Sequence, residues 1–459
     1  RKLMSKRLFT IFAVILVTLL FAAPVLGGIS GTGASGIQIQ NLNTSSNAVV
    51  NVLLYNQDGT APIEISATGG DIIAAGAAKN YYLPTIPGLT SGAYSMVANS
   101  GDPLAAIART DWSASGGAAL YSTVDPGTDV VIPLVVHNYA NQNSQISIQN
   151  TDTSASINDV KITLLGRGLA SPVAELTNQS IPAATSVTYD VTPAQFGVSS
   201  FPVTGDLSSG FVGSIQIESA TQLVVQSLID IPGTPGVTGF SGVATASAAN
   251  TLYCPLIRAN YYGDTGISIV NPGGSPVDVD ITFYADSGSP NAGTFLQEIS
   301  VGANSSEVAF QGCTGNSRST PTDLPGGSQN CSNPVLTNDG FYGVAKLEAT
   351  GGNILAVVND TTFGNGWAVE AQSTYNCATV NEAGTKFALP LVRSFHLSDT
   401  KLTTGIQIQN TTGSPVTVSL DLVNWDGTSQ SSSNPADIVV PANGSGNFWN
   451  GSLTDLPTV

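Results

Sequence analysis

Charged residues are scarce in this sequence. Only 10% of its 459 residues are Asp, Glu, Lys or Arg, whereas an average soluble chain carries about 25%. The chain holds two histidines, too few for a multi-histidine zinc site and unfavourable for a histidine-dependent triad. It also lacks a Gly-x-Ser-x-Gly elbow, a Walker-type loop and a His-Glu-x-x-His pair. We therefore expect a protein that is not an enzyme and needs no cofactor.

Positive charge is the scarcer of the two signs. The formal net charge is -17, and four of the cations, Arg1, Lys2, Lys6 and Arg7, lie at the extreme N-terminus. The remainder is thus more acidic than the total suggests. An acidic surface repels nucleic acid and anionic lipid, so the sequence predicts neither as a partner.

Four cysteines are present, and all fall in one part of the chain. Because an export signal precedes them, disulfides are the expectation, with Cys313 paired to Cys331 and Cys254 paired to Cys377. Free thiols in a reducing compartment are the alternative. A zinc site is disfavoured because the sequence has no Cys-x-x-Cys pair.

The N-terminal segment is typical of an export signal. Residues 1–28 contain Lys6 and Arg7, an uncharged apolar run from Leu8 to Ala23 and an exit rich in small residues. We predict a cleaved signal helix, with Met4 as the initiator. An uncleaved membrane anchor is the alternative, because the apolar stretch approaches spanning length.

Long hydrophobic runs are otherwise missing, and short alternating ones take their place. The phrase Gly-Ile-Gln-Ile-Gln-Asn occurs at 36–41 and again at 405–410, with variants at 145–150 and 266–271. Alternation with period two predicts β-strands whose isoleucines face a core and whose polar residues face water. The closing Asn is expected to turn the chain.

The phrase sets the register of a tandem repeat. A Pro-apolar strand precedes it at 132–135, 254–257 and 389–392, and an alternating strand that often ends in Asp-Gly follows it. A Gly-Phe-x-Gly segment and a further apolar strand complete the pattern, at 210–213 and 340–343 in the middle repeats. The predicted boundaries are 1–28 for the signal, then 29–131, 132–252, 253–387 and a truncated 388–459 for four modules, each owning a complete core.

Module 1 raises a separate question at its N-terminal edge. Residues 23–26, Ala-Pro-Val-Leu, occupy the position of its proline strand. If cleavage spares them, the module is complete; if cleavage falls near Gly27, the module has an open edge that could accept a strand from another subunit.

Candidate binding residues lie mostly in predicted loops. Two histidines and two arginines follow the proline strands, and several aromatics could stack on a sugar; the candidate set is His137, Arg258, Arg393, His396, Trp112, Trp367 and Trp425. For adjacent aromatics such as Tyr81 and Tyr82, one ring should be buried and the other exposed. Turn carboxylates, including Asp230 and Asp360, could hold calcium, but no dense run of ligands supports it.

The repeated pattern resembles tandem immunoglobulin-like modules of bacterial secreted and cell-surface proteins. The resemblance implies an all-β array of about four immunoglobulin-like β-sandwich domains. It also implies an extracellular or cell-surface location, a structural or adhesive role, and partners among surface or matrix components, glycans or further copies of the chain. A carbohydrate-binding array, or an enzyme with a catalytic domain after residue 459, are the alternatives.

Overall fold

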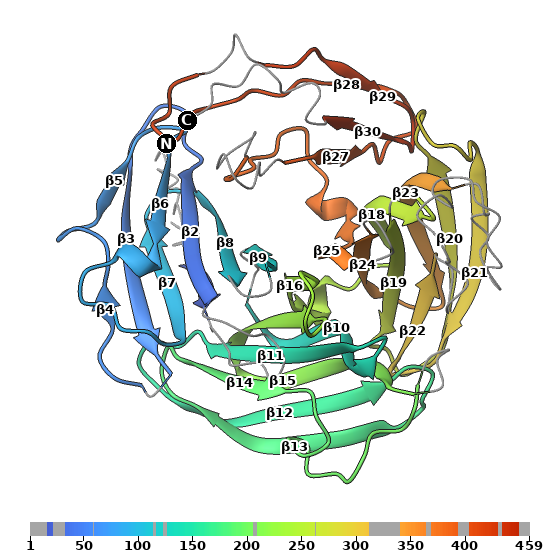
Figure 1. Ribbon diagram of the computed structural model, residues 1–459, viewed down its shortest axis with the longest axis horizontal. Helices are drawn as coiled ribbons and strands as arrows, with labels where there is room; N and C mark the ends of the chain where they lie inside the picture. The colour runs from blue at the N-terminus through green and yellow to red at the C-terminus, as the bar shows by residue number, and fades with distance from the viewer. Residues whose placement is uncertain are drawn as a thin grey trace, which may run out of the picture.

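The chain folds almost entirely into β-strands (Figure 1). The computed structural model describes residues 16–21, 33–57, 59–112, 116–122, 126–204, 209–261, 263–311, 340–363, 369–392, 404–429 and 434–448. Within these ranges the helical elements are short 3-10 turns, η1 (Leu83–Thr85), η2 (Thr245–Ser247) and η5 (Val380–Glu382). None of the described helices is long and apolar enough to cross a membrane. The predicted all-β class is confirmed.

Two sheets build each of the first three repeats, which we call modules, and we name the sheets I and II. In module 1, sheet I has the order β1-β7-β3-β4, with β5 also on β3, and sheet II has the order β6-β2-β8-β9. The strands are β1 (Leu16–Phe21), β2 (Gly33–Asn41), β3 (Ala48–Asn56), β4 (Ile63–Glu64), β5 (Asp71–Ile73), β6 (Ala78–Tyr82), β7 (Tyr94–Ser100), β8 (Leu104–Trp112) and β9 (Ala118–Ser122).

Module 2 repeats this plan, with one long strand passing through both sheets. Sheet I is β13-β12-β15-β10 and sheet II is β14-β11-β15-β16, while β17 extends the edge at β10. The strands are β10 (Gly127–Tyr139), β11 (Gln142–Asn150), β12 (Ile157–Gly166), β13 (Pro172–Ile181), β14 (Ser186–Asp190), β15 (Phe211–Asp230), β16 (Val237–Ser241) and β17 (Val243–Ala244).

Module 3 has sheet I in the order β21-β20-β23-β18-β26 and sheet II in the order β22-β19-β24-β25. Its strands are β18 (Thr251–Ala259), β19 (Gly263–Asn271), β20 (Val277–Ala285), β21 (Thr294–Val301), β22 (Ser305–Phe310), β23 (Phe341–Thr350), β24 (Leu355–Phe363), β25 (Val369–Asn376) and β26 (Ala378–Thr379). Module 4 contributes two pairs, β27 (Ile406–Gln409) with β30 (Ser445–Phe448) and β28 (Val416–Val418) with β29 (Ile438–Val440).

The isoleucines of the repeated phrase anchor the cores of modules 1 to 3, as predicted, whereas Ile406 and Ile408 of module 4 are half-buried. Ile37 and Ile39 in module 1 and Ile267 and Ile269 in module 3 are fully buried, among residues contributed by both sheets. Face-to-face sheets with a shared core form a β-sandwich. The cores are less separate than expected, however, because Leu228 and Val237 of module 2 belong to the core cluster of module 1.

The strand order differs from that of an immunoglobulin domain. Immunoglobulin sheets have the orders ABED and CFG, in which the first strand pairs with the second. Here the first strand of module 3, β18, pairs with β23 and β26. The alternating pattern identifies strands and their buried faces, but it carries little information about which strand pairs with which. The strand order of module 3 therefore departs from the immunoglobulin order, and the β-sandwich is retained.

The first strand of module 1 comes from the predicted signal segment. Leu16–Phe21 form β1, which pairs antiparallel with β7, so this part of the expected signal helix is a strand. Its β-branched and aromatic residues suit a strand, and β1 takes the place that β10 and β18 hold in the next modules. Residues 22–32, which include the expected proline strand at 23–26, lie outside the described ranges.

The predicted module boundaries compare with the strands as follows. The boundaries at 131/132 and 252/253 fall inside β10 and β18, each of which begins before its proline motif. The boundary at 387/388 follows η5. The first two boundaries fall inside strands because they were predicted beside the Ile-Pro and Cys-Pro pairs, and these pairs lie within β10 and β18 rather than at their starts.

A disulfide closes module 3. Cys254 on β18 and Cys377, next to β26, are joined with an S–S distance of 2.01 Å and a Cα–Cα distance of 4.6 Å. The pairing predicted for these two cysteines is confirmed. Cys313 and Cys331 lie outside the described residues.

The modules are arranged as a closed ring (Figure 1). Module 1 contacts module 2, module 2 contacts module 3, and module 3 contacts module 4, as consecutive modules must. Module 4 also contacts module 1: the backbone N–H of Ala78 donates to the carbonyl of Trp425 at 3.0 Å. The array is thus circular rather than an extended row.

Candidate functional site: the joints between modules

The closing Asn of the phrase holds the same hydrogen bonds in all four modules. In module 3 the Asn271 amide nitrogen reaches the carbonyls of Ser275, Val301 and Gly302 at 2.7, 3.3 and 2.9 Å. Its side-chain oxygen accepts from the N–H of Gly273 at 2.9 Å. Asn41, Asn150 and Asn410 do the same in their own modules. The Asn turns the chain, as predicted, and also ties it to one connection in its module, which is β5 to β6, β13 to β14, β21 to β22 or β29 to β30.

That connection, or the start of the strand that follows it, is one half of every joint. The other half is the turn after the alternating strand of the preceding module. A Cβ added to Gly59 of module 1 would lie 3.3 Å from Cβ of Pro182 in module 2, and one added to Gly427 of module 4 would lie 3.2 Å from Cβ of Ala77 in module 1. Between modules 3 and 4, Ser445 Oγ donates to Asp286 Oδ2 at 2.9 Å. The Asp-Gly turn of the repeat is therefore a docking element.

Module 2 uses different chemistry at the same place. Its turn has the sequence Leu-Gly-Arg-Gly at 165–168, and the N–H of Gly168 donates to the carbonyl of Ser306 in module 3 at 2.9 Å. Arg167 Nε donates to Glu307 Oε2 at 2.9 Å, with both side chains largely buried. An ion pair thus replaces the Asp-Gly contact, and the shared role of this turn persists without its shared residues.

The polar side chains of the phrase also lie at the joints. Ser268, between the two isoleucines of module 3, donates to the carbonyl of Pro133 in the proline strand of module 2 at 2.6 Å. Gln38 has the equivalent place in module 1 and donates to the carbonyl of Pro390, the matching proline of module 4. Gln409 donates to the carbonyl of Ala345 in module 3 at 3.1 Å.

The prediction that the polar side chains of the phrase face water is therefore wrong for much of the chain. Gln145, Gln149 and Ser268 are 4%, 0% and 2% exposed. The polar face of sheet II is covered because neighbouring modules pack there. Period-two alternation distinguishes two faces of a strand, but it does not distinguish water from a polar interface.

Apolar contacts accompany the polar ones at two joints. Tyr55 and Val97 of module 1 form a buried cluster with Ala184 of module 2. Val131 of module 2 clusters with Val270 and Leu355 of module 3. Burial of this kind stabilises each joint by an amount that grows with its apolar area, about 25 cal/mol per Å².

The binding residues predicted from the sequence differ widely in their exposure. Trp112 is 2% exposed and belongs to the core of module 1, so it cannot line a ligand loop. Trp425 is 75% exposed. In the predicted aromatic pair, Tyr81 is 3% exposed and Tyr82 is 45% exposed, as alternation requires. Arg393, His396 and Trp367 lie outside the described residues.

His137 lies at the end of β10 against a cluster of phenylalanines. Its ring packs edge-on to Phe201 at a centroid distance of 5.6 Å, and Nε2 lies 3.0 Å from the side-chain nitrogen of Asn138. Burial lowers the pKa of His137 below its usual value, which favours the neutral ring at pH 7. We assign it a packing role.

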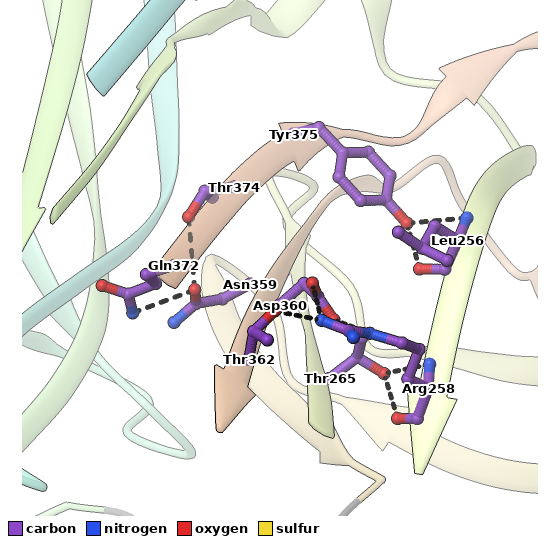
Figure 2. A network of polar contacts seen from close by, with 9 residues as sticks. All are labelled: Leu256, Arg258, Thr265, Asn359, Asp360, Thr362, Gln372, Thr374 and Tyr375. Carbon is purple, nitrogen blue, oxygen red and sulfur yellow. Dashed lines mark hydrogen bonds and ion pairs between the residues drawn. The ribbon is translucent and has the colours of Figure 1, made fainter. Parts of the chain in front are cut away.

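Arg258 is held inside module 3 (Figure 2). Its guanidinium donates to both oxygens of Asp360, at 2.8 and 2.5 Å, and to Thr362 Oγ1 at 2.7 Å. Burial raises the pKa of Asp360, an effect that the Arg258 charge opposes. Because Arg258 lies on β18 and Asp360 on β24, the pair links sheet I to sheet II.

A second link between the same sheets lies nearby in Figure 2. The Tyr375 hydroxyl, on β25, accepts from the N–H of Leu256 at 3.0 Å and donates to the carbonyl of the same residue at 2.5 Å. These bonds satisfy backbone groups of β18 beside its proline, where the ladder with β23 is interrupted. The arrangement in Figure 2 is structural: each charged or hydroxyl group that it shows has a partner within the protein.

The described residues offer no grouping suited to a metal ion. No cluster of three or more His, Cys, Asp or Glu side chains occurs among them. A surface depression of 520 Å³ between β10, β12 and β15 is lined by Asp129, Asp159, Lys161 and Glu218. Lys161 pairs with Glu218 at 3.6 Å there. His137, Arg258, Trp112 and Trp425 make no contact with one another in the described part of the chain.

Asp230 is the one buried carboxyl here whose Oδ2 has no partner among the described residues. It lies at the end of β15 and is 2% exposed. Burial, and to a lesser extent the charge of Asp190, raises the pKa of Asp230 to about 6. Sequence reasoning identified Asp230 only as a turn carboxylate. The residues of the joints carry one signal in the repeat, the polar position between the two isoleucines, where Gln38 and Ser268 each bond the carbonyl of a proline in the preceding module.

Comparisons with known proteins add little to this geometry. No protein-family model matches the chain, and no curated protein matches it. Among solved structures, one similar chain is described as "Biofilm associated protein - B domain", with a TM-score of 0.16 and 7% identity, covering 49% of this chain and 84% of that chain. At that TM-score the likeness carries no argument.

Proposed function

We propose that the protein is an exported, non-enzymatic structural or adhesion-type repeat protein of the cell surface, built as a ring of β-sandwich modules. The observation that carries the proposal is the repeated joint. Gln38 and Ser268, at equivalent positions, bond equivalent prolines of the preceding module. A chain that repeats the same contact at two of its joints to fix one module against the next is organised as a scaffold.

The pairing of charged side chains with one another supports the same proposal. The ion pair of Arg258 with Asp360 joins two sheets, and the ion pair of Arg167 with Glu307 joins two modules. Groups engaged in this way are unavailable to a substrate. The low charge content and the export signal predicted from residues 1–28 fit a secreted or surface protein whose disulfide at Cys254 and Cys377 forms in an oxidising compartment.

Protease treatment of intact cells that make the protein tests this function. We expect external protease to degrade the protein while a cytoplasmic marker survives. A variant with Lys6→Glu and Arg7→Glu, which reverses the charge of the signal, should leave the protein inside and protected. Protection of the unaltered protein in intact cells would overturn the proposed location and, with it, the function.

Carbohydrate binding is a second candidate, favoured by one residue. Trp425 exposes 75% of its surface on the turn that docks onto module 1, and an exposed indole face can stack on a sugar ring. A glycan array should then give binding that Trp425→Ala removes and Tyr82→Ala, a matched exposed aromatic in module 1, leaves in place. No binding by the unaltered protein would count decisively against this candidate.

A further inference from the structure

The joint between modules 4 and 1 differs from the others because these two modules do not follow one another in the chain. Modules 1 and 2, 2 and 3, and 3 and 4 follow one another in the chain, so their joints re-form after any opening. Modules 4 and 1 meet only because the ring closes. We call this joint the seam; it comprises the contacts of Gln38 with Pro390, of Ala78 with Trp425, and of Gly427 with Ala75 and Ala77.

The seam is more polar than the joint of modules 1 and 2 and the joint of modules 2 and 3. Module 1 shares buried apolar clusters with module 2, through Ala184, Leu228 and Val237, and module 2 shares one with module 3. No described residue of module 4 enters the core cluster of module 1. Among the described residues the seam, like the joint of modules 3 and 4, therefore lacks the shared apolar cluster that stabilises the other two joints.

The two faces of the seam fit each other whichever chain supplies them. The turn of module 4 docks on module 1 as the turn of module 1 docks on module 2: the Cβ positions of Gly427 and Ala77 are 3.2 Å apart, and those of Gly59 and Pro182 are 3.3 Å apart. A joint of this design needs no covalent link between its halves. Module 4 of a second copy presents the same surfaces as module 4 of the first.

We propose that the seam is an interaction surface for a second copy of this chain, in which module 4 of one copy docks on module 1 of another. The contact is heterologous, so repeated exchange gives either a larger closed ring or an open head-to-tail assembly. The inference goes beyond surface display, because it holds for the purified protein in solution. Closure within one chain is favoured by an effective concentration of the order of millimolar, so exchange becomes prominent where copies are crowded together.

Single cysteines on separate chains test the exchange. Chains carrying Ala77→Cys are mixed with chains carrying Gly427→Cys at a total concentration on the order of 1 mM and oxidised. The Cβ separation is close to that of a disulfide, about 3.5–4.5 Å. We expect a disulfide-linked heterodimer on a non-reducing gel, at a yield about tenfold above that of either variant alone.

A matched control uses a joint that the chain itself connects. Gly59→Cys mixed with Pro182→Cys probes the joint of modules 1 and 2 with nearly the same Cβ separation. We expect it to give no heterodimer above background, because these modules remain together in one chain. Equal yields from the seam pair and the control pair, at every concentration, would overturn the proposal.

A second measurement does not depend on the single variants. Light scattering should show the mass of the unaltered protein rising with concentration toward dimers and larger species. A chain carrying both Ala77→Cys and Gly427→Cys, oxidised within itself, should stay monomeric over the same range and recover association on reduction. A monomeric unaltered protein at the highest concentration would also overturn the proposal. The result is independent of where the protein is found in the cell.

Discussion

The asparagine at the end of each repeated phrase is the residue whose role is most uniform in the molecule. Asn271 holds three carbonyls with its amide nitrogen and one N–H with its oxygen. Neither Asp nor Ser can supply this set, because the carbonyls require a donor and the N–H requires an acceptor on the same short side chain. The phrase therefore needs Asn at this position.

Asn271→Asp should accordingly destabilise the protein strongly. The change keeps the shape of the side chain but directs a carboxylate oxygen at three carbonyl groups, and each unsatisfied buried group costs about 1–3 kcal/mol. Urea unfolding should show a loss of at least about 3 kcal/mol. Asn353→Asp, at an exposed site in the same module, serves as the control. A similar small effect from both variants would contradict the role of Asn271.

Asp230 gives a prediction of pH dependence at the same scale. Its pKa is raised from 3.8 to about 6, chiefly by burial, so the folded state retains a proton that the unfolded chain has released. The free energy of unfolding should therefore fall as pH rises from about 4 to about 6, and stay lower above that.

Asp230→Asn removes the ionisation and should flatten this part of the pH profile. At pH 8 the variant should be more stable than the unaltered protein, by about 1–3 kcal/mol, while at pH 4 the two should be similar. Thermal unfolding across pH 4–8 measures the difference, with the exposed Asp278→Asn as control. A variant that is less stable than the parent at pH 8 would show that Asp230 is ionised and stabilising.

At the scale of elements, the sandwiches depend on links between sheet I and sheet II. The Arg258–Asp360 pair joins β18 to β24, with the two side chains 13% and 6% exposed. Burying two charges costs nearly as much as their attraction returns, but removing one partner leaves an uncompensated charge. The pair is therefore expected to act as a unit.

Arg258→Leu should lower the free energy of unfolding by about 3–5 kcal/mol. The double variant Arg258→Leu with Asp360→Leu should recover most of that loss, because no buried charge remains. A double-mutant cycle in urea gives the coupling energy. Additive losses from the two single substitutions would mean that the pair contributes nothing as a pair.

The sequence is most informative about individual strands and their buried residues. Alternation located the strands and the buried isoleucines, such as Ile37 and Ile267, because a buried face leaves a direct mark on residue order. Cys254 and Cys377 were paired correctly since they open and close one module. Strand order could not be read in this way: pairing β18 with β23 depends on contacts about 90 residues apart, which no local pattern encodes.

The sequence does not reveal the joints, for a related reason. Gln38, Ser268 and Gln149 carry the same polar pattern whether they face water or a neighbouring module. The sequence also contained the docking turn, as Asp-Gly, but a turn that docks has the same residues as a turn that is free. Module 2 shows the limit most clearly, because Arg167 replaces the shared chemistry with an ion pair to Glu307.

At the scale of the whole molecule, the main feature is the closure of the ring. Linear arrays of modules contact only their sequence neighbours, whereas here module 4 reaches back to module 1 through Trp425 and Pro390. Closure changes what the protein can do, because a ring presents a fixed arrangement of loops, whereas a row of modules can bend at each link.

Small-angle X-ray scattering of the purified, monomeric protein at low concentration tests this closure most directly. We expect a compact particle whose largest dimension is much shorter than four modules laid end to end, and the oxidised Ala77→Cys, Gly427→Cys chain should give the same curve. An elongated profile, with the cross-section of one module and a length close to four modules end to end, would contradict it.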